Sequence, residues 1–316
     1  MNRRTLVTGG AGFIGTHLVR RLLASGEEVT VLDDLSGGGT GAGLPAAVRF
    51  VRGDVRDRDL VADLASRADG IIHLAALVSV QSCISNWSLG HQINLSGTMN
   101  VLHAAQQAGN LPIVYASSAA VYGDLSGQSC HENMRPRPIS PYAADKLACE
   151  HQAQAMAHVF GMPSVGLRFF NIYGPLQDAR SPYAGVISRF CANRLSNAPH
   201  TVFGDGLQSR DFVHVSDVVE GLIRARDRAD GSSSADVYNI CTGNSTTLLH
   251  LAATIDDIAG QGAAQVVHAP AKAGDIRESR GDPSLAREQL GFVASIDIIQ
   301  GLRDLWSTLD EGAAVR

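Results

Sequence analysis

A tyrosine and a lysine four residues apart are the side chains of this sequence best suited to proton transfer. Tyr142 and Lys146 follow Ser140-Pro141, a typical helix start, so both should lie on one face of a helix. The whole chain contains only two lysines, which argues against a chance pairing. A phenol with a pKa of about 10 is a poor base at neutral pH, but an adjacent ammonium favours its ionised form. We therefore predict a tyrosine base assisted by a lysine; the alternative is a pair of solvent-facing side chains.

Two serines, Ser117 and Ser118, stand at the end of a strand-like run that begins at Ile113. Open α/β sheets bind ligands at the carboxyl ends of their strands, so a hydroxyl there could bond a reacting oxygen. Serines at such a position are often only helix caps. The G-x-S-x-G pattern of serine hydrolases is absent from the sequence around them, so we do not predict a serine hydrolase.

A glycine-rich turn, GGAGFIG at residues 9–15, follows the apolar run 4–8 and precedes a helical pattern. Gly9 suits a tight turn, Gly12 lets a pyrophosphate approach the backbone, and Gly15 permits close packing of helix and strand. The free N–H groups and the dipole of the helix attract phosphates. This arrangement predicts a dinucleotide site. The residues expected to form it are Gly9, Gly12, Phe13, Ile14 and Gly15.

A carboxylate ends the next predicted strand. Asp33 can accept hydrogen bonds from the ribose hydroxyls of adenosine and repel a 2′-phosphate, which favours NAD over NADP. Residues 34–39 contain no cation that could favour NADP. The alternative for Asp33 is a solvated turn residue. Asp54 and Val55 end the third predicted strand, where we expect the adenine edge.

Strand-like and helix-like runs alternate through the first half of the chain, which predicts a doubly wound parallel sheet of six or seven strands, an α/β Rossmann fold. The strand-like runs are 4–8, 28–32, 48–53, 70–75, 113–117 and 164–170, and the helical runs are 14–24, 60–65, 91–108 and 142–160.

The pattern loosens after residue 171, which predicts a smaller α+β substrate-binding lobe. We expect the chain to return to the sheet through a helix at 215–226 and a strand at 237–241. The predicted NAD-binding domain is 1–170, rejoined by about 213–243, and the substrate lobe is 171–212 and 244–316. The glycine-rich segment 36–43 should be a surface loop.

Composition excludes several classes of protein. The chain has 316 residues, 45% hydrophobic and 18% charged, so it can fold around a full core. Its net charge is −5 with no clustered basic stretch, which argues against a nucleic-acid partner. No apolar run approaches the roughly 18 to 20 residues of a membrane span, and Arg3-Arg4 precedes too short an apolar run for a signal peptide. We expect a cytoplasmic protein that does not bind membranes.

The cysteines suggest neither a metal site nor a disulfide framework. They are five in number, widely spaced and without a C-x-x-C pair. We interpret them as small core residues.

The motifs together resemble those of the extended short-chain dehydrogenases, in particular the nucleotide-sugar 4-epimerases. The match runs in order over nearly the whole chain. Its elements are GGAGFIG (9–15), Asp33, HLAA (73–76), SSAAVYG (117–123), YAADK (142–146), RFFNIYGP (168–175) and SRDFVHVSD (209–217).

The resemblance implies catalytic and cofactor roles. Tyr142 is the base, Lys146 lowers its pKa and binds the nicotinamide ribose, and Ser118 hydrogen-bonds the sugar O4. The cationic nicotinamide, together with Lys146, favours the phenolate of Tyr142. Ala75, Asn94 and Ser117 lie on the cofactor side.

On the substrate side, the resemblance implies that Asn171 contacts the diphosphate and that Arg210 clamps it, with Lys272 and Arg277 as further cations. A fork of donors suits phosphate, although a surface ion pair is the alternative for Arg210.

The implied reaction is epimerisation at carbon 4 of a UDP-hexose. Tyr142 takes the O4 proton while carbon 4 gives a hydride to NAD, and the keto sugar then turns and receives the hydride on its other face. Related 4,6-dehydratases and decarboxylases carry an acidic residue just after the site serine. Here Ala119 and Ala120 occupy that stretch, which leaves epimerisation.

Small residues at the sugar end favour UDP-GlcNAc and UDP-GalNAc, with UDP-glucose and UDP-galactose also possible. Ser279 stands where a large gate residue restricts the UDP-glucose enzymes, and Ser79 aligns with a serine that contacts the acetyl group; the UDP-glucose enzymes tend to have a lysine where this chain has Val78. A serine gate also suits a UDP-glucuronate 4-epimerase, in which Arg180 or Arg189 would pair with the carboxylate.

A non-catalytic protein that senses NAD or a nucleotide sugar is the alternative of another class. Intact Ser118, Tyr142 and Lys146 argue against it. The helical runs 91–108 and 142–160 carry more apolar residues than one stripe needs, which predicts a homodimer, as is common in the family, unless the small lobe covers them.

Overall fold

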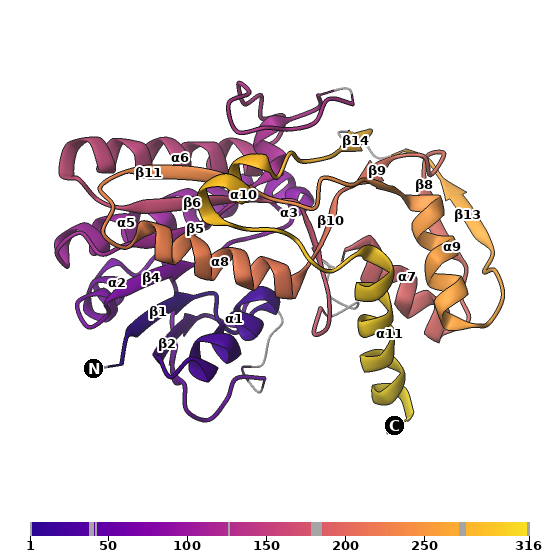
Figure 1. Cartoon of the computed structure of the whole chain (residues 1–316), viewed down its shortest axis with the longest axis horizontal. Helices are drawn as coiled ribbons and strands as arrows, with labels where there is room; N and C mark the ends of the chain where they lie inside the picture. Colours follow the sequence, from indigo (N-terminus) through magenta and orange to yellow (C-terminus); the bar gives the residue numbers. More distant parts are fainter. Residues whose placement is uncertain are drawn as a thin grey trace.

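The computed structural model describes residues 2–37, 41, 43–125, 127–177, 185–271 and 276–314. A seven-stranded sheet with helices on both faces forms one lobe, and a smaller lobe of short sheets and helices lies beside it (Figure 1). Of the predicted loop 36–43, residues 38–40 and 42 lie outside the described part of the chain.

All pairs in the large sheet are parallel, which confirms the predicted fold class. The strand order β11-β6-β5-β4-β1-β2-β3 reverses direction between β1 and β4, and ligands of such sheets bind at the carboxyl ends beside this switch point. The strands are β1 (Arg4–Thr8), β2 (Glu28–Asp33), β3 (Arg49–Arg52), β4 (Gly70–His73), β5 (Ile113–Ser118), β6 (Ser164–Phe169) and β11 (Ala235–Ile240).

Two hydrophobic cores lie on opposite faces of this sheet, because β1, β2, β4 and β5 direct apolar side chains to both faces. One face is covered by α1 (Phe13–Ala24), α8 (Val215–Ala229) and α10 (Ser284–Leu290). The other is covered by α2 (Arg58–Ala65), α5 (Gly97–Gln107) and α6 (Pro141–Phe160).

The predicted helical run 91–108 is helical from 91 to 107, but it is not one uninterrupted α-helix. The structure has α4 (Trp87–His91), a π-helical turn η1 (Gln92–Ser96) and then α5, preceded by α3 (Val80–Ser85). The wider turn places the Asn94 side chain inside the protein, where it bonds the backbone of Leu77. Tertiary hydrogen bonds therefore override the helical periodicity at this point.

The second lobe has its own core, which packs α7 (Val186–Leu195), α9 (Leu248–Ala259) and α11 (Ile298–Ala314) around short strands. Its strands are β7 (Asn171–Tyr173) beside β10 (Phe212–His214), β8 (His200–Phe203) beside β13 (Val266–Ala269), and β9 (Ser209–Arg210) between β12 (Thr246–Thr247) and β14 (Glu278–Ser279). The chain enters this lobe after β6 and returns to the large sheet through α8 and β11 (Figure 1).

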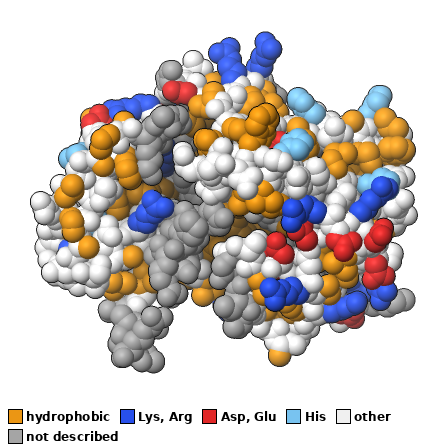
Figure 2. Space-filling view, turned by 180° about the vertical axis from the view of Figure 1, so that it is seen from behind, with side chains coloured by type: hydrophobic (Ala, Val, Ile, Leu, Met, Phe, Trp, Pro, Cys, Tyr) orange, Lys and Arg blue, Asp and Glu red, His pale blue; other side chains and the backbone are white. Residues whose placement is uncertain are grey.

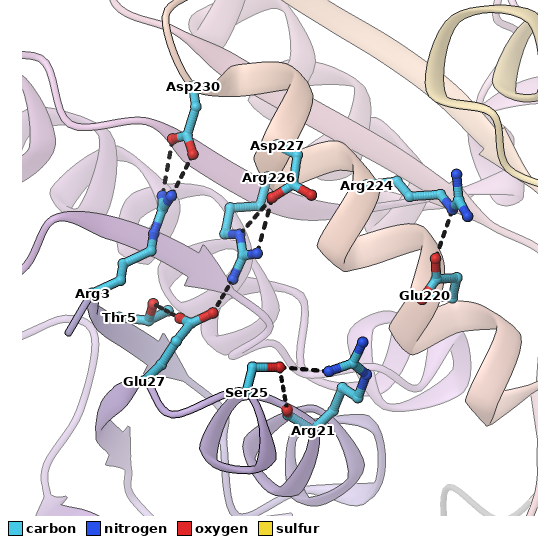
Figure 3. A network of polar contacts seen from close by, with 10 residues as sticks. All are labelled: Arg3, Thr5, Arg21, Ser25, Glu27, Glu220, Arg224, Arg226, Asp227 and Asp230. Carbon is cyan, nitrogen blue, oxygen red and sulfur yellow. Dashed lines mark hydrogen bonds and ion pairs between the residues drawn. The ribbon is translucent and has the colours of Figure 1, made fainter.

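A polar network closes the amino-terminal edge of the large sheet, away from the switch point. Arg226 of α8 contacts Glu27, which also accepts a hydrogen bond from Thr5, and Arg3 contacts Asp230 (Figure 3). These contacts hold the returning helix α8 against β1 and the start of β2.

Surface charge is mixed in sign. On the face in Figure 2, acidic and basic side chains intermingle over the Rossmann lobe, and exposed ion pairs include Arg4 with Asp69 and Arg67 with Asp63. Among the described residues, no helix has the length and apolar composition to cross a bilayer. All five cysteines are free and buried, as predicted for core residues.

Candidate active site

The glycine turn between β1 and α1 lies at the carboxyl edge of the sheet, beside the switch point. Gly9 has φ +70°, a left-handed conformation, and a Cβ there would lie 2.6 Å from the Ala75 nitrogen. A Cβ on Gly15 would lie 2.3 Å from the Gly9 oxygen. Gly15 therefore lets α1 pack closely against the glycine turn, whereas we had expected close packing against the strand. A Cβ on Gly12 would meet only the Gly9 oxygen, at 3.3 Å. The backbone at Gly12 is therefore open to a ligand.

The first turn of α1 has the properties of a phosphate site. Gly12 is its N-cap residue, no side chain caps it, and the turn contains no acidic residue. Phe13 and Ile14 begin the helix, so their N–H groups are among the donors that have no partner within the helix.

Asp33 at the end of β2 organises the same turn. Its two carboxylate oxygens accept hydrogen bonds from the N–H groups of Ala11 and Leu35, both at 2.9 Å. Burial raises the pKa of Asp33, while these two backbone donors oppose the rise. Each oxygen keeps a further lone pair, so the carboxylate can still accept from ribose hydroxyls.

Asp54 and Val55 lie in the turn just after β3, which ends at Arg52. A hydrogen bond from Arg56 lowers the pKa of Asp54. Val55 is buried, and its Cγ2 would lie 2.7 Å from a Cβ on Gly97 of α5. The Val55 side chain thus packs in the core against α5.

The Asn94 side chain is bonded within the chain. Its side chain is 0% exposed; Oδ1 accepts from the Leu77 N–H at 2.8 Å and Nδ2 donates to the Leu77 oxygen at 3.1 Å. Both ends of the amide are therefore used by the chain itself. Asn94 thus holds the loop after β4, which contains Ala75, and its place on the cofactor side stays a prediction.

A buried chain of hydrogen bonds, which the sequence did not reveal, links β1, β4 and α5. Thr98 Oγ1 donates to the Asn94 oxygen at 2.6 Å, so it must accept from His73 Nε2 at 3.0 Å. His73 Nδ1 is then the acceptor for Thr8 Oγ1, at 2.6 Å. Burial, and secondarily Lys146, lowers the pKa of His73 to about 3, so the ring is neutral. The HLAA motif was the one signal for this histidine.

The predicted catalytic residues come together where β5 meets α6. Ser140 caps α6, with Pro141 in its first turn, and Tyr142 and Lys146 project from one face of the helix. Tyr142 forms a hydrogen bond with Ser118. Lys146 Nζ lies 5.9 Å from the centre of the Tyr142 ring and donates to the backbone oxygen of Ala116 at 2.8 Å. Ser118 also accepts from the Ala120 N–H, so it is both a cap and a partner of the tyrosine.

Burial dominates the electrostatics of this group. Tyr142 is 8% exposed and Lys146 is 3% exposed. Burial raises the pKa of Tyr142 to about 12, and the hydrogen bond with Ser118 acts in the opposite direction. Burial also lowers the pKa of Lys146. In the protein without its cofactor, burial therefore outweighs the hydrogen bond with Ser118, and a lowered tyrosine pKa stays a prediction for the site with the cationic nicotinamide beside it.

Ser117 precedes Ser118 directly and bonds a further residue of α6. It is buried, and its hydroxyl donates to Glu150 of α6, which also holds Arg168 of β6. The Ser117 hydroxyl is thus bonded to an ion pair, and the place of Ser117 on the cofactor side stays a prediction. Glu150 was not among the residues predicted from the sequence.

The second lobe brings two predicted substrate residues together. Arg210 of β9 and Ser279 of β14 are register partners in adjacent parallel strands. Asn171 is exposed at the start of β7, where its N–H donates to the Asp211 oxygen at 3.0 Å. The Arg277 side chain pairs with Asp205 at 2.6 Å in an exposed position, so it is engaged away from Arg210 and Ser279.

The other residues predicted to bind the substrate lie outside this pair of strands. Ser79 caps α3 by accepting from the Ser82 N–H at 3.1 Å, and the neighbouring Val78 is exposed. Arg189 is exposed on α7. Lys272 and Arg180 lie outside the described residues.

Asp211 is a further residue that the sequence did not single out, although it follows Arg210 directly. It is completely buried and accepts from the N–H and hydroxyl of Thr242 and from the N–H groups of Gly243 and Gly281. Its own N–H donates to the Ser279 oxygen at 2.9 Å. Asp211 thereby fixes the strands that carry Arg210 and Ser279.

Comparisons with known proteins agree with this architecture. The model of the NAD dependent epimerase/dehydratase family matches residues 5–241. The chain is 37% identical to the UDP-glucose 4-epimerase of Mycolicibacterium smegmatis, over 95% of this chain and 96% of that protein.

Two solved structures are similar over nearly their whole length. One is the UDP-glucose 4-epimerase of Thermotoga maritima with UDP-glucose, with a TM-score of 0.92, 31% identity and coverage of 98% of this chain and 99% of that one. The other is the UDP-N-acetylglucosamine 4-epimerase of Methanobrevibacter ruminantium in complex with UDP-N-acetylmuramic acid, with a TM-score of 0.91, 30% identity and the same coverage.

Proposed function

The chain belongs to the NAD dependent epimerase/dehydratase family, and from this premise we propose that it interconverts UDP-GlcNAc and UDP-GalNAc. It is an isomerase, an NAD-dependent UDP-sugar 4-epimerase. The observation that carries the proposal is the meeting of Tyr142, Ser118 and Lys146 at the sheet edge that also holds the glycine turn.

The residues at the glycine turn fit NAD. A Cβ at Gly9 or Gly15 would collide with backbone, and the uncapped start of α1 supplies donors for a pyrophosphate. The Asp33 carboxylate, whose pKa is raised by burial, stands at the end of β2 for the ribose hydroxyls. Lys146 would hold the nicotinamide ribose. Bound NAD would supply the hydride acceptor and donor for carbon 4 of the sugar.

The chain's own residues handle the proton. Tyr142 accepts the proton of the sugar O4 and returns it after the sugar has turned, and Ser118 hydrogen-bonds the same oxygen. Because Tyr142 and Lys146 are almost fully buried, water has little access to the transferring proton. Burial raises the pKa of Tyr142, so the cations near it must stabilise the phenolate that accepts the proton.

The residues after Ser118 favour epimerisation over dehydration. Ala119 and Ala120 begin the short helix η2 (Ala119–Tyr122) that Ser118 caps. Neither alanine can move a proton at carbon 5 or carbon 6, which a dehydratase requires. This supports the epimerase branch of the family.

The sugar preference rests on small side chains. Ser279 is the register partner of Arg210, so a small residue stands beside the proposed diphosphate clamp. Ser79 would contact the acetyl group, and Asn171 would contact the diphosphate. We also propose that 1–170 with about 213–243 binds NAD and that 171–212 with 244–316 binds the UDP-sugar, except that α10 (Ser284–Leu290) packs on the large sheet and belongs to the first lobe.

The test is a product analysis with three substrates. Purified protein is incubated separately with UDP-GlcNAc, UDP-glucose and UDP-glucuronate, and the nucleotide sugars are resolved by chromatography. We expect UDP-GalNAc to form fastest. Faster turnover of UDP-glucuronate would contradict the preference, and no epimer from any of the three, with NAD bound, would favour a sensor.

The gate has its own prediction. Ser279→Tyr should lower kcat/KM for UDP-GlcNAc at least tenfold relative to that for UDP-glucose, because a large side chain would fill the space for an acetamido group. The matched control is Ser284→Tyr at the start of α10, which should leave the ratio unchanged. An unchanged ratio in Ser279→Tyr would remove Ser279 from the specificity proposal.

We propose further that the protein is a cytoplasmic homodimer. Ile84 and Trp87, on α3 and α4, are 52% and 66% exposed, and both helices pack against α6. Large exposed apolar side chains of this kind are typical of subunit interfaces. Light scattering after gel filtration should give twice the mass of one chain; a mass of 33.3 kDa, that of one chain, would contradict it.

A further inference from the structure

A third polar residue continues the catalytic face of α6. Tyr142, Lys146 and Glu150 follow one another at intervals of four residues, and Glu150 is 1% exposed. One of its carboxylate oxygens accepts from Ser117 Oγ and from Arg168 Nε at 2.9 Å, and the other accepts from Arg168 Nη2 at 2.6 Å. Glu150 therefore ties α6 to both β5 and β6.

Arg168 extends this contact to the segment after Ser118. Its Nη1 donates to the Tyr122 hydroxyl at 2.9 Å, and its guanidinium carbon lies 4.8 Å from the centre of the Tyr122 ring. Tyr122 ends η2, the helix that Ser118 caps, and its hydroxyl donates to Asn239 of β11 at 2.7 Å. The network thus holds Ser118 from both neighbours, through Ser117 before it and through η2 after it.

Stability alone does not explain a charged pair at this depth. Taking two charges out of water is costly, and well-packed apolar side chains of similar volume often stabilise a protein as well or better. What a two-point contact between guanidinium and carboxylate adds is a fixed direction and spacing. Here that spacing sets α6, which carries Tyr142, against the end of β5, which carries Ser118.

We propose that Glu150 and Arg168 are positioning residues that hold Tyr142 in hydrogen-bond contact with Ser118 and so control proton transfer at the sugar O4. The proposal rests on the proposed function, because it assigns the proton transfer to Tyr142. Neither residue reaches the substrate, since both lie buried between α6 and the sheet.

The decisive variant exchanges the ion pair for apolar side chains of similar size, Glu150→Leu with Arg168→Met. Glu150→Gln keeps the volume but presents an amide N–H toward the donors of Ser117 and Arg168. The control is the exposed pair of α8, Glu220→Leu with Arg224→Met. Each protein is measured for urea unfolding, bound NAD, kcat and KM for UDP-GlcNAc, and the pH dependence of kcat.

We expect the double variant to fold and to retain NAD, with kcat at least tenfold lower and KM within twofold of the parent value. The hydrogen bond with Ser118 lowers the pKa of Tyr142, so its loss moves the rise of kcat to higher pH. Glu150→Gln should shift the same profile in the same direction. A purely structural role would change unfolding and leave the profile in place.

A parent-like kcat and pH profile in the folded double variant overturns the proposal, as does a loss of kcat that the α8 control shares. If the double variant does not fold, Glu150→Gln decides by the same readouts. A readout independent of activity is the ¹³Cζ chemical shift of Tyr142 in tyrosine-labelled protein, assigned with Tyr142→Phe. If the parent enzyme turns over no UDP-sugar, the proposed function fails, and this shift still decides whether Glu150 and Arg168 set the Tyr142–Ser118 contact.

Discussion

The protonation of single side chains decides what this site can do. Tyr142 has its pKa raised to about 12 by burial, Lys146 has its pKa lowered, and Ser118 provides the hydrogen bond that favours the phenolate. A buried phenol of this kind keeps its proton at neutral pH until positive charge approaches it. The site therefore couples proton removal to cations held close to the ring.

Removal of the phenol hydroxyl tests this coupling. Tyr142→Phe should lower kcat by a factor of about 10² to 10⁴, the usual contribution of a positioned acid or base, and should leave NAD bound. In the parent enzyme kcat should rise with pH, because the reactive form of Tyr142 is the ionised one. Initial rates between pH 6 and 10 and the NAD content of both proteins check this. Substantial activity in Tyr142→Phe would refute the assigned role.

His73 gives the protein a pH-dependent stability. Its pKa falls from 6.5 to about 3 on folding because it is buried, so the unfolded chain binds the proton first. The contribution is complete above pH 6.5 and is lost as the pH falls toward 3, by about 1.4 kcal/mol per pH unit. Between pH 7.5 and 5 we expect the parent to lose about 2 kcal/mol more than His73→Gln in urea unfolding. His250→Gln, at an exposed histidine of α9, is the control and should follow the parent.

Helices, strands and contacts between residues close in sequence could be predicted, whereas contacts between residues far apart in sequence could not. The strands alternate with helices in the sequence itself, and Tyr142 and Lys146 meet through one helical turn, so both were accessible to inspection. The Glu150–Arg168 pair and the His73 chain join residues of different strands and helices, and their contacts arise only from the strand order. The π-helical turn at Asn94 was not predicted for the same reason, because it depends on a hydrogen bond with Leu77.

Asp211 shows how one buried carboxylate can set the geometry of several short strands. In Asp211→Asn an amide N–H would face the N–H groups that the carboxylate now accepts, so one or more donors would lose their partner. We expect KM for the UDP-sugar to rise about tenfold or more, with NAD content unchanged, because Arg210 and Ser279 would shift. Asp63→Asn, at an exposed pair, is the control. A parent-like KM in Asp211→Asn would show that these strands do not depend on the carboxylate.

The two edges of the large sheet contribute differently to the whole molecule. One edge carries the catalytic residues, and the other carries the polar network that anchors α8. The chain leaves the large sheet after β6, builds much of the second lobe and returns through α8, whose last turn is held to Glu27 by Arg226 (Figure 3). This contact secures the returning segment far from Tyr142. A defect there should cost stability without changing the chemistry.

Glu27→Ala separates these two contributions. The side chains of Glu27 and Arg226 are only 10% and 13% exposed, so the deletion leaves a largely buried guanidinium with Asp227 as its remaining partner. We expect unfolding in urea to lose about 2 kcal/mol, less than a fully buried pair would because Asp227 remains. Glu220→Ala, in a pair with about 40% exposure on α8, should cost no more than about 0.5 kcal/mol. Both variants should keep the kcat and KM of the parent at 25 °C. A changed KM in Glu27→Ala would mean that the anchoring of α8 reaches the site through β10, and that stability and substrate binding are coupled across the two lobes.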